Sequence, residues 1–105
     1  MPLDASFTQL PNQTVEVTLN GPMTLGTSLK VLESQLKSSL KDGATHLILN
    51  MAAVNYMDSA GLGLIVFTNA ELTGKNGTLL LRGVNQRIHD LFERTRTDAI
   101  LKFDA

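Results

Sequence analysis

Apolar residues recur along this chain with two different periods, and these periods divide it into strands and helices. Thr14–Leu19 alternates apolar and polar residues, which is typical of a strand with one buried face. Residues 27–41 carry leucines three and four positions apart, which predicts an amphipathic helix. Thr27 or Ser28 is expected to cap its start, and Gly43 suits the position just after its end. The leucine stripe comprises Leu25, Leu29, Leu32, Leu36 and Leu40.

Shorter apolar runs continue the alternation on both sides of these two elements. The first half of the helix expected after position 58 is apolar on nearly all sides, so it is either deeply buried or offers an apolar surface to a partner. The other expected strands are Phe7–Leu10, His46–Leu49, Thr78–Arg82 and Ala99–Phe103, and the other expected helices are Ser59–Thr73 and Asn85–Thr95.

This order of elements, ββαβαβαβ, predicts an α/β sandwich. We expect a mixed, mostly parallel sheet of about four to five strands with the helices packed against it. Strands separated by one helix should run parallel with right-handed crossovers, and the first two strands should form an antiparallel hairpin at the sheet edge. The length of 105 residues is close to the commonest domain size, so one domain is expected over residues 1–105.

Composition narrows the possible functions. The chain has no Cys, which excludes disulfides and thiolate metal sites. A net charge of −1 argues against nucleic acid as a partner, and a mild cluster of Arg87, Arg94 and Arg96 is expected to be a solvated face. No apolar run reaches the roughly 20 residues that span a bilayer, and no signal peptide is recognisable. We therefore expect no membrane insertion and a cytoplasmic location.

The segment most informative about chemistry lies where a strand ends and a helix begins, near Ser59. The first N–H groups of a helix are free and its dipole is positive at this end, so a hydroxyl here is well placed to carry a phosphate. Gly61 and Gly63 would let another group approach the backbone. Asp58 would repel the phosphate or help to hold the hydroxyl. A plainer alternative is that Asp58 and Ser59 only start the helix and the glycines only allow close packing.

Enzymatic interpretations of the same serine are weak. A nucleophile elbow would need glycine at position 57, which is Met57, and nothing brings His89 toward Ser59. Two lone histidines, His46 and His89, lack the spacing of metal ligands. The glycines do not form a phosphate-binding loop. The sequence therefore predicts a protein that is not an enzyme and has no cofactor or metal.

Residues 58–63, Asp-Ser-Ala-Gly-Leu-Gly, resemble the signature of STAS domains. The preceding apolar strand and loop (residues 47–54), the next turn and strand (74–81) and the following helix (84–95) also resemble that family. The similarity extends from about Thr14 to Phe103. Among STAS domains, the chain resembles the bacterial anti-sigma factor antagonists.

This resemblance implies a switch rather than a reaction. In that family the motif serine, here Ser59, is phosphorylated by a partner that is both a serine kinase and an anti-sigma factor. The unphosphorylated form binds this partner and frees the sigma factor, and a phosphatase resets the switch. Asp58, Ala60, Gly61 and Gly63 would be the phosphosite neighbours. Residues expected to contact the partner are Leu62, Met57 and Thr24, although Met57, like Leu64, could instead belong to the core.

Three departures from the family pattern stand out. Thr24 and Asn50 occupy positions where the family often has acidic residues, so the acidic floor near the phosphosite should be thinner. The chain stops just after the last expected strand, so the family's terminal helix should be short or missing.

The alternative function is a non-catalytic scaffold or regulatory subunit in a stress-signalling or lipid-transport complex.

Overall fold

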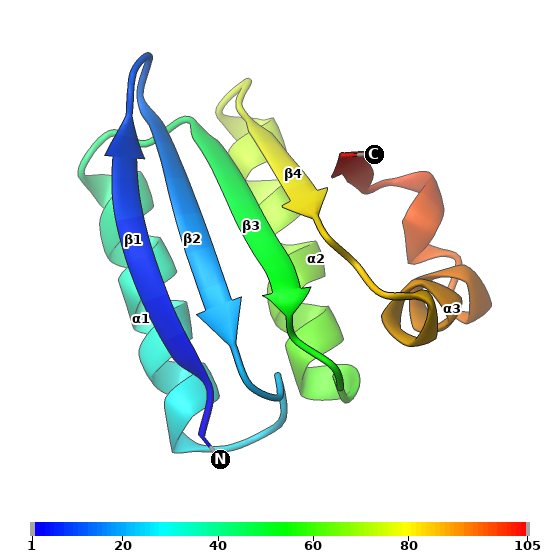
Figure 1. Ribbon diagram of the computed structural model, residues 1–105. Helices are drawn as coiled ribbons and strands as arrows, with labels where there is room; N and C mark the ends of the chain where they lie inside the picture. The colour runs from blue at the N-terminus through cyan, green and yellow to red at the C-terminus, as the bar shows by residue number, and fades with distance from the viewer. Residues whose placement is uncertain (1, 105) are drawn as a thin grey trace.

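The computed structural model, which describes residues 2–104, contains one five-stranded sheet with the strands in chain order, β1-β2-β3-β4-β5. The ends of the expected domain, residues 1 and 105, lie outside the described part. Helices alternate with the strands after β2, as Figure 1 shows, and this confirms the predicted α/β class. The elements are β1 (Asp4–Leu10), β2 (Thr14–Asn20), α1 (Thr27–Lys41), β3 (His46–Ala53), α2 (Ser59–Gly74), β4 (Thr78–Arg82), α3 (Gln86–Arg94) and β5 (Lys102–Asp104).

Strand directions follow from the length of each connection. β1 and β2 pair antiparallel, with Leu10 opposite Thr14 across a turn in which Asn12 and Gln13 have φ of 64° and 58°. The pairs β2–β3, β3–β4 and β4–β5 are all parallel, because each connection carries a helix that returns the chain to the same end of the sheet. The expected edge hairpin and parallel strands are both confirmed.

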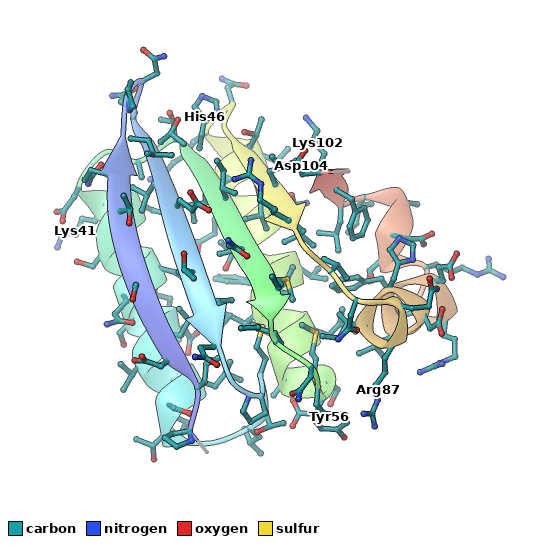
Figure 2. The ribbon with its side chains drawn as sticks, viewed as in Figure 1. Lys41, His46, Tyr56, Arg87, Lys102 and Asp104 are labelled. Carbon is teal, nitrogen blue, oxygen red and sulfur yellow. The ribbon has the colours of Figure 1, made fainter. Side chains whose placement is uncertain are left out.

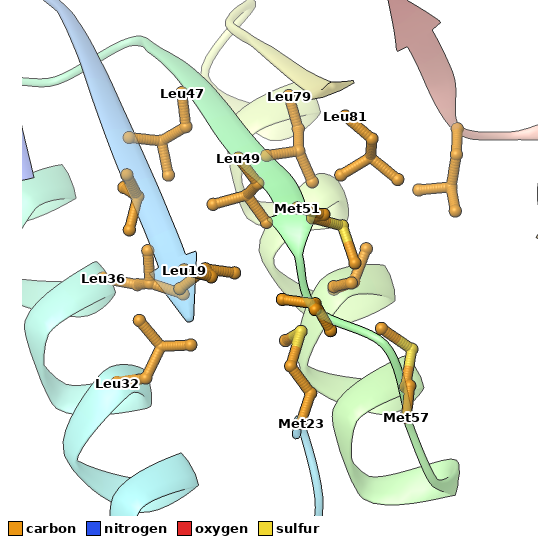
Figure 3. Packing of buried hydrophobic residues seen from close by; sticks show 14 of the residues in the cluster. Leu19, Met23, Leu32, Leu36, Leu47, Leu49, Met51, Met57, Leu79 and Leu81 are labelled. Carbon is orange, nitrogen blue, oxygen red and sulfur yellow. The ribbon is translucent and has the colours of Figure 1, made fainter. Parts of the chain in front are cut away.

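The helices cover one face of the sheet. In Figure 1, α1 and α2 lie behind the strands and α3 lies beyond β4. The apolar residues of β2, β3 and β4 point toward the leucines of α1 and the buried stripe of α2, as Figure 3 shows. Burial of this kind contributes about 25 cal/mol per Å² of apolar surface, which makes it the main source of stability. Fully buried members include Val17, Leu19, Leu47, Leu49, Ile65, Leu72, Leu81 and Phe92.

The start of α1 differs from expectation. Gly26, not Thr27 or Ser28, is the N-cap, and no side chain caps the helix. The Ser28 hydroxyl instead accepts a bond of 3.3 Å from the Leu3 N–H, which ties α1 to the start of the chain. Leu25 precedes the helix and is 76% exposed, so it lies outside the buried stripe. Gly43 follows the C-cap with φ of 108°, as predicted.

Two strand boundaries also differ. β3 runs to Ala53, because Asn50 pairs in register with strands on both sides despite its polar side chain. The last strand begins at Lys102, and residues 97–99 form a 3₁₀ turn after a left-handed Arg96. The expected strand start at Ala99 was wrong: the Ile100 N–H donates to the Thr97 carbonyl at 3.1 Å and closes the turn, so pairing with β4 begins only at Lys102.

The sequence of α2 was compatible with a deeply buried helix or with one that exposes an apolar surface, and the helix has one face of each kind. Its buried stripe consists of Gly61, Ile65, Thr68 and Leu72, and Thr68 bonds the Leu64 carbonyl at 2.7 Å. On the outer side, Phe67 is 51% exposed. The helix is thus both a core element and an apolar surface. Over residues 2–104, no helix is long and apolar enough to cross a membrane.

Candidate functional site

Three connections meet at the carboxyl ends of the parallel strands β2, β3 and β4. The Met23 N–H donates to the Tyr56 carbonyl at 3.0 Å, and the Asp58 N–H donates to the Met23 carbonyl at 3.2 Å. The β2–α1 loop therefore runs alongside the β3–α2 loop. Asn85, which caps α3, also donates to the Val54 carbonyl at 3.2 Å. These bonds bring the starts of α2 and α3 to one place.

Asp58 is the residue that organises the start of α2. Its Oδ1 accepts bonds from the N–H groups of Ala60 and Gly61 at 2.9 and 3.1 Å, which makes Asp58 the N-cap. Its Oδ2 accepts a bond of 2.9 Å from the Leu25 N–H. One carboxylate thus joins α2 to the loop before α1. The Leu25 N–H, followed by those of Gly61 and Ala60, holds the pKa of Asp58 below its ordinary value, because these donors favour the charged form.

Ser59 is the first residue of α2 and lies exposed beside this cap. Asp58 and Ser59 do start the helix, with Asp58 as its cap and Ser59 as its first residue. Within the described chain, the Ser59 hydroxyl makes no side-chain hydrogen bond. Asp58 therefore does not hold this hydroxyl, which remains free to accept a group from solvent.

The two glycines of the motif have different roles. An added Cβ on Gly61 would lie 2.9 Å from the Met23 Cβ and closer still to the Met23 carbonyl oxygen. Gly61 therefore lets α2 pack directly against the β2–α1 loop. A Cβ on Gly63 would meet nothing within 4 Å. Gly63 faces solvent, so close packing explains why a glycine is needed at position 61 but not at position 63.

One groove beside the start of α2 is mainly apolar, and we call it the apolar groove. It lies between α1 and α2 and has a volume of about 240 Å³. Its apolar walls include two side chains that are more than half exposed, Leu25 and Phe67. Clusters of this kind mark interaction sites more often than isolated exposed residues do. The walls also include Leu29, Ala60, Gly63 and Leu64.

A second groove, the basic groove, lies on the other side of Ser59. It separates the start of α2 from α3 and has a volume of about 450 Å³. Arg87 stacks over the ring of Tyr56, with its guanidinium carbon 5.1 Å from the ring centre. Figure 2 shows these two side chains together at one end of the molecule. The lining includes Tyr56, Ser59, Leu62, Arg87, Leu91 and Arg94.

The residues expected around the phosphosite are placed unequally. Leu62 is half-buried and lines the basic groove, and Thr24 lies in the loop that pairs with Met57 and Asp58. Met57 is only 5% exposed and pairs with Met23 through a backbone bridge, and Figure 3 draws both among the buried hydrophobic residues, so Met57 belongs to the core. The sequence reasoning missed Leu25 as a surface residue. Leu25 precedes Gly26, the N-cap of α1, and this position outside the helix was the available sign that it need not join the buried stripe.

Asn50 does not lie at the site. Its neighbours Leu49 and Met51 point into the core, so its side chain lies on the opposite, open face of the sheet. There it donates to Glu16 at 3.4 Å, and Glu16 also pairs with Arg82 at 3.5 Å. The expectation that Asn50 thins an acidic floor near Ser59 was therefore wrong. Only Thr24 is positioned to have that effect.

The histidines are engaged elsewhere. His89 stacks on Phe103 with ring centres 4.9 Å apart and lies 3.8 Å from Glu93. His46 bonds the Thr78 hydroxyl at 2.8 Å, at the amino end of β3. No group of three or more His, Asp or Glu residues within 2–104 could hold a metal ion. Neither histidine lines the groove that contains Ser59.

Comparison with known proteins identifies the family. The STAS domain model matches residues 7–105. An anti-sigma-B factor antagonist of Staphylococcus aureus is 39% identical over 80 residues, covering 76% of this chain and 73% of that protein.

Solved structures show the same fold at 19% identity. The anti-sigma factor antagonist SpoIIAA matches in its unphosphorylated form with a TM-score of 0.79, covering 97% of this chain and 88% of the other. Its phosphorylated Bacillus form gives 0.78 with 97% and 92% coverage. A putative anti-sigma factor antagonist of Thermotoga maritima gives 0.87 with 96% and 86% coverage. The family match and the sequence relative together show that this chain belongs to the STAS domain family, in which it is similar to the anti-sigma factor antagonists.

Proposed function

We propose that this protein is an anti-sigma factor antagonist that acts in the cytoplasm and is controlled by phosphorylation of Ser59. When unphosphorylated, it binds a serine-kinase anti-sigma factor and frees the sigma factor. Phosphorylation of Ser59 by that kinase ends binding, and a phosphatase restores it. The observation that carries this proposal is an exposed, unbonded hydroxyl on the first residue of α2, which lines the basic groove and directly precedes Ala60 of the apolar groove.

The chemistry required of this chain is modest. Ser59 Oγ attacks the γ-phosphorus of ATP, the new P–O bond forms, and ADP leaves with the electrons of the broken bond. The serine proton passes to a base that the kinase supplies, because the oxygens of the neighbouring Asp58 carboxylate accept bonds from backbone N–H groups and not from this hydroxyl. What this chain contributes is presentation: Asp58 holds the start of α2 rigidly, and Gly61 keeps it close to the β2–α1 loop.

The apolar groove is the surface proposed for the partner, together with Leu62 and Thr24. Leu25 and Phe67 expose large apolar side chains there, and desolvating such anchors supplies most of the free energy in typical interfaces. A phosphate next to this surface would bring about −1.5 to −2 charges into the interface. Burying an uncompensated charge is costly, so phosphorylation would weaken binding.

The first experiment tests the acceptor. Wild type, Ser59→Ala and the control Ser38→Ala, an exposed serine on α1, are incubated with host cell lysate and Mg-ATP and weighed by intact-mass spectrometry. We expect one phosphate on wild type and Ser38→Ala and none on Ser59→Ala. If none of the three is modified while a known STAS antagonist is, the phosphorylation switch is refuted, and a scaffold or regulatory subunit becomes the better explanation.

The second experiment tests binding to the purified kinase by calorimetry. Ser59→Ala should bind within about twofold of wild type, and Ser59→Asp at least about tenfold more weakly. Leu25→Ser should also lose about tenfold in affinity, since hot-spot anchors are worth about 2 kcal/mol. Ile100→Ser is the matched control, because Ile100 is a similarly exposed apolar residue outside the groove. Equal losses for Leu25→Ser and Ile100→Ser would show that the apolar groove is not the interface.

A further inference from the structure

A phosphate on Ser59 would meet an unfavourable local environment in α2 itself. It would lie next to the Asp58 carboxylate, whose pKa is already lowered and which is therefore charged at neutral pH. The N–H groups of Ala60 and Gly61, which would otherwise bind an anion at the helix start, are bonded to Asp58 Oδ1. The positive charge that balances the phosphate must therefore come from another element.

Helix α3 presents that charge across the basic groove. Arg87 and Arg94 are seven residues apart, so they lie on one helix face about two turns from each other. Both line the same cavity as Ser59, and its volume of about 450 Å³ is ample for a phosphate group. Across residues 2–104, no ion pair involves either guanidinium. The two arginines are thus available on the wall that faces the serine.

We propose that the phosphate on Ser59 is bound within the same chain by Arg87 and Arg94, and that Arg87 leaves the ring of Tyr56 to bind it. This inference rests on the proposed function, in which Ser59 is the phosphate acceptor. A guanidinium–phosphate pair is stronger than an exposed contact between a guanidinium and an aromatic ring, so the exchange is favourable. In the phosphorylated protein, the basic groove is closed by its own side chains and a partner loses this surface.

The test places the phosphate without any kinase. Phosphoserine is incorporated at position 59 by genetic code expansion, and phosphorus NMR follows its second ionisation with pH. Three proteins are compared: wild type, Arg87→Gln/Arg94→Gln, and the control Lys41→Gln/Lys102→Gln. The control removes the same charge from exposed lysines that lie outside the groove, at other ends of the molecule in Figure 2.

Nearby cations favour the dianion and lower its pKa from about 6. We expect this pKa in wild type and in the lysine control to be about half to one unit lower than in Arg87→Gln/Arg94→Gln. That difference is about a threefold to tenfold change in proton affinity. Equal values in all three proteins, or an equal rise in the lysine control, would overturn the proposal. Equal values in all three proteins are the result expected if the arginines bind only an acidic segment of a partner.

Tyr56 supplies an independent signal, since it is the one tyrosine of the chain and there is no tryptophan. Its fluorescence should change on phosphorylation of wild type, because Arg87 departs, and should change much less in Arg87→Gln. Identical emission from phosphorylated and unphosphorylated wild type would contradict the exchange. Because the phosphate is installed during synthesis, a failure here leaves the kinase experiment unaffected. A chain that no kinase modifies would refute the proposed function without altering this measurement.

Discussion

Two glycines of the motif, two positions apart on α2, allow a sharp test of how this helix is packed. Gly61→Ala would place a methyl group 2.9 Å from the Met23 Cβ and 3.0 Å from the Met57 Cγ, and closer still to the Met23 carbonyl oxygen. Gly63→Ala would place the same methyl group in open space. The chemical change is identical, so any difference in stability between the variants reports the packing alone.

The magnitudes follow from these surroundings. Replacing glycine by alanine inside a helix stabilises it by about 1 kcal/mol, and somewhat less near its start. At Gly61 this gain is outweighed by overpacking, which costs about 1–3 kcal/mol. The Met23 carbonyl cannot retreat easily because it accepts the Asp58 N–H at 3.2 Å. We expect Gly61→Ala to lose about 1–2 kcal/mol of the free energy of unfolding. Gly63→Ala should gain up to about 1 kcal/mol.

Urea and thermal unfolding followed by far-UV circular dichroism would measure this difference. At about 4–8 °C per kcal/mol for a domain of this size, the two variants should differ in Tm by roughly 10–20 °C. If Gly61→Ala is as stable as Gly63→Ala, then α2 is not held against the β2–α1 loop as described.

Other predictions concern single residues of the site and core. Asp58→Ala should cost about 0.5–2 kcal/mol in urea unfolding, as lost N-caps do. Because folding lowers the pKa of Asp58, its charged form stabilises the protein above the unfolded value of about 4. This contribution disappears as the pH falls through the folded pKa. The difference in the free energy of unfolding between wild type and Asp58→Asn should therefore vanish in acid. A difference that does not depend on pH would contradict this prediction. Ser59→Ala should change stability by less than about 0.5 kcal/mol, as surface substitutions do, since Ser59 is not the cap. Phe92→Ala should lose about 3–5 kcal/mol, because Phe92 is fully buried.

Much of the fold could be predicted because its determinants are local. The alternation in β2, the leucine spacing of α1 and the glycine after it all act within a few residues, and each appears in the structure where expected. The parallel strands follow from helices that separate them, and the edge hairpin from a short turn. Where local patterns carried less information, the observed element boundaries differ from the expected ones. The apolar run around Ile100 became a turn, closed by the bond from the Ile100 N–H to the Thr97 carbonyl.

The sequence by itself determined the order of elements, the strand directions and the position of an exposed serine at the start of α2. Only the tertiary structure decided what surrounds that serine. Asp58 caps α2 through its own neighbours, but its second oxygen bonds the Leu25 N–H, 33 positions away, and Arg87 reaches the groove from another helix. Leu25 stays exposed in the loop that this bond holds, and Asn50 finds its partner Glu16 on a neighbouring strand, 34 positions away. Such contacts depend on which loops meet at the end of the sheet, and no periodicity within one segment records that meeting.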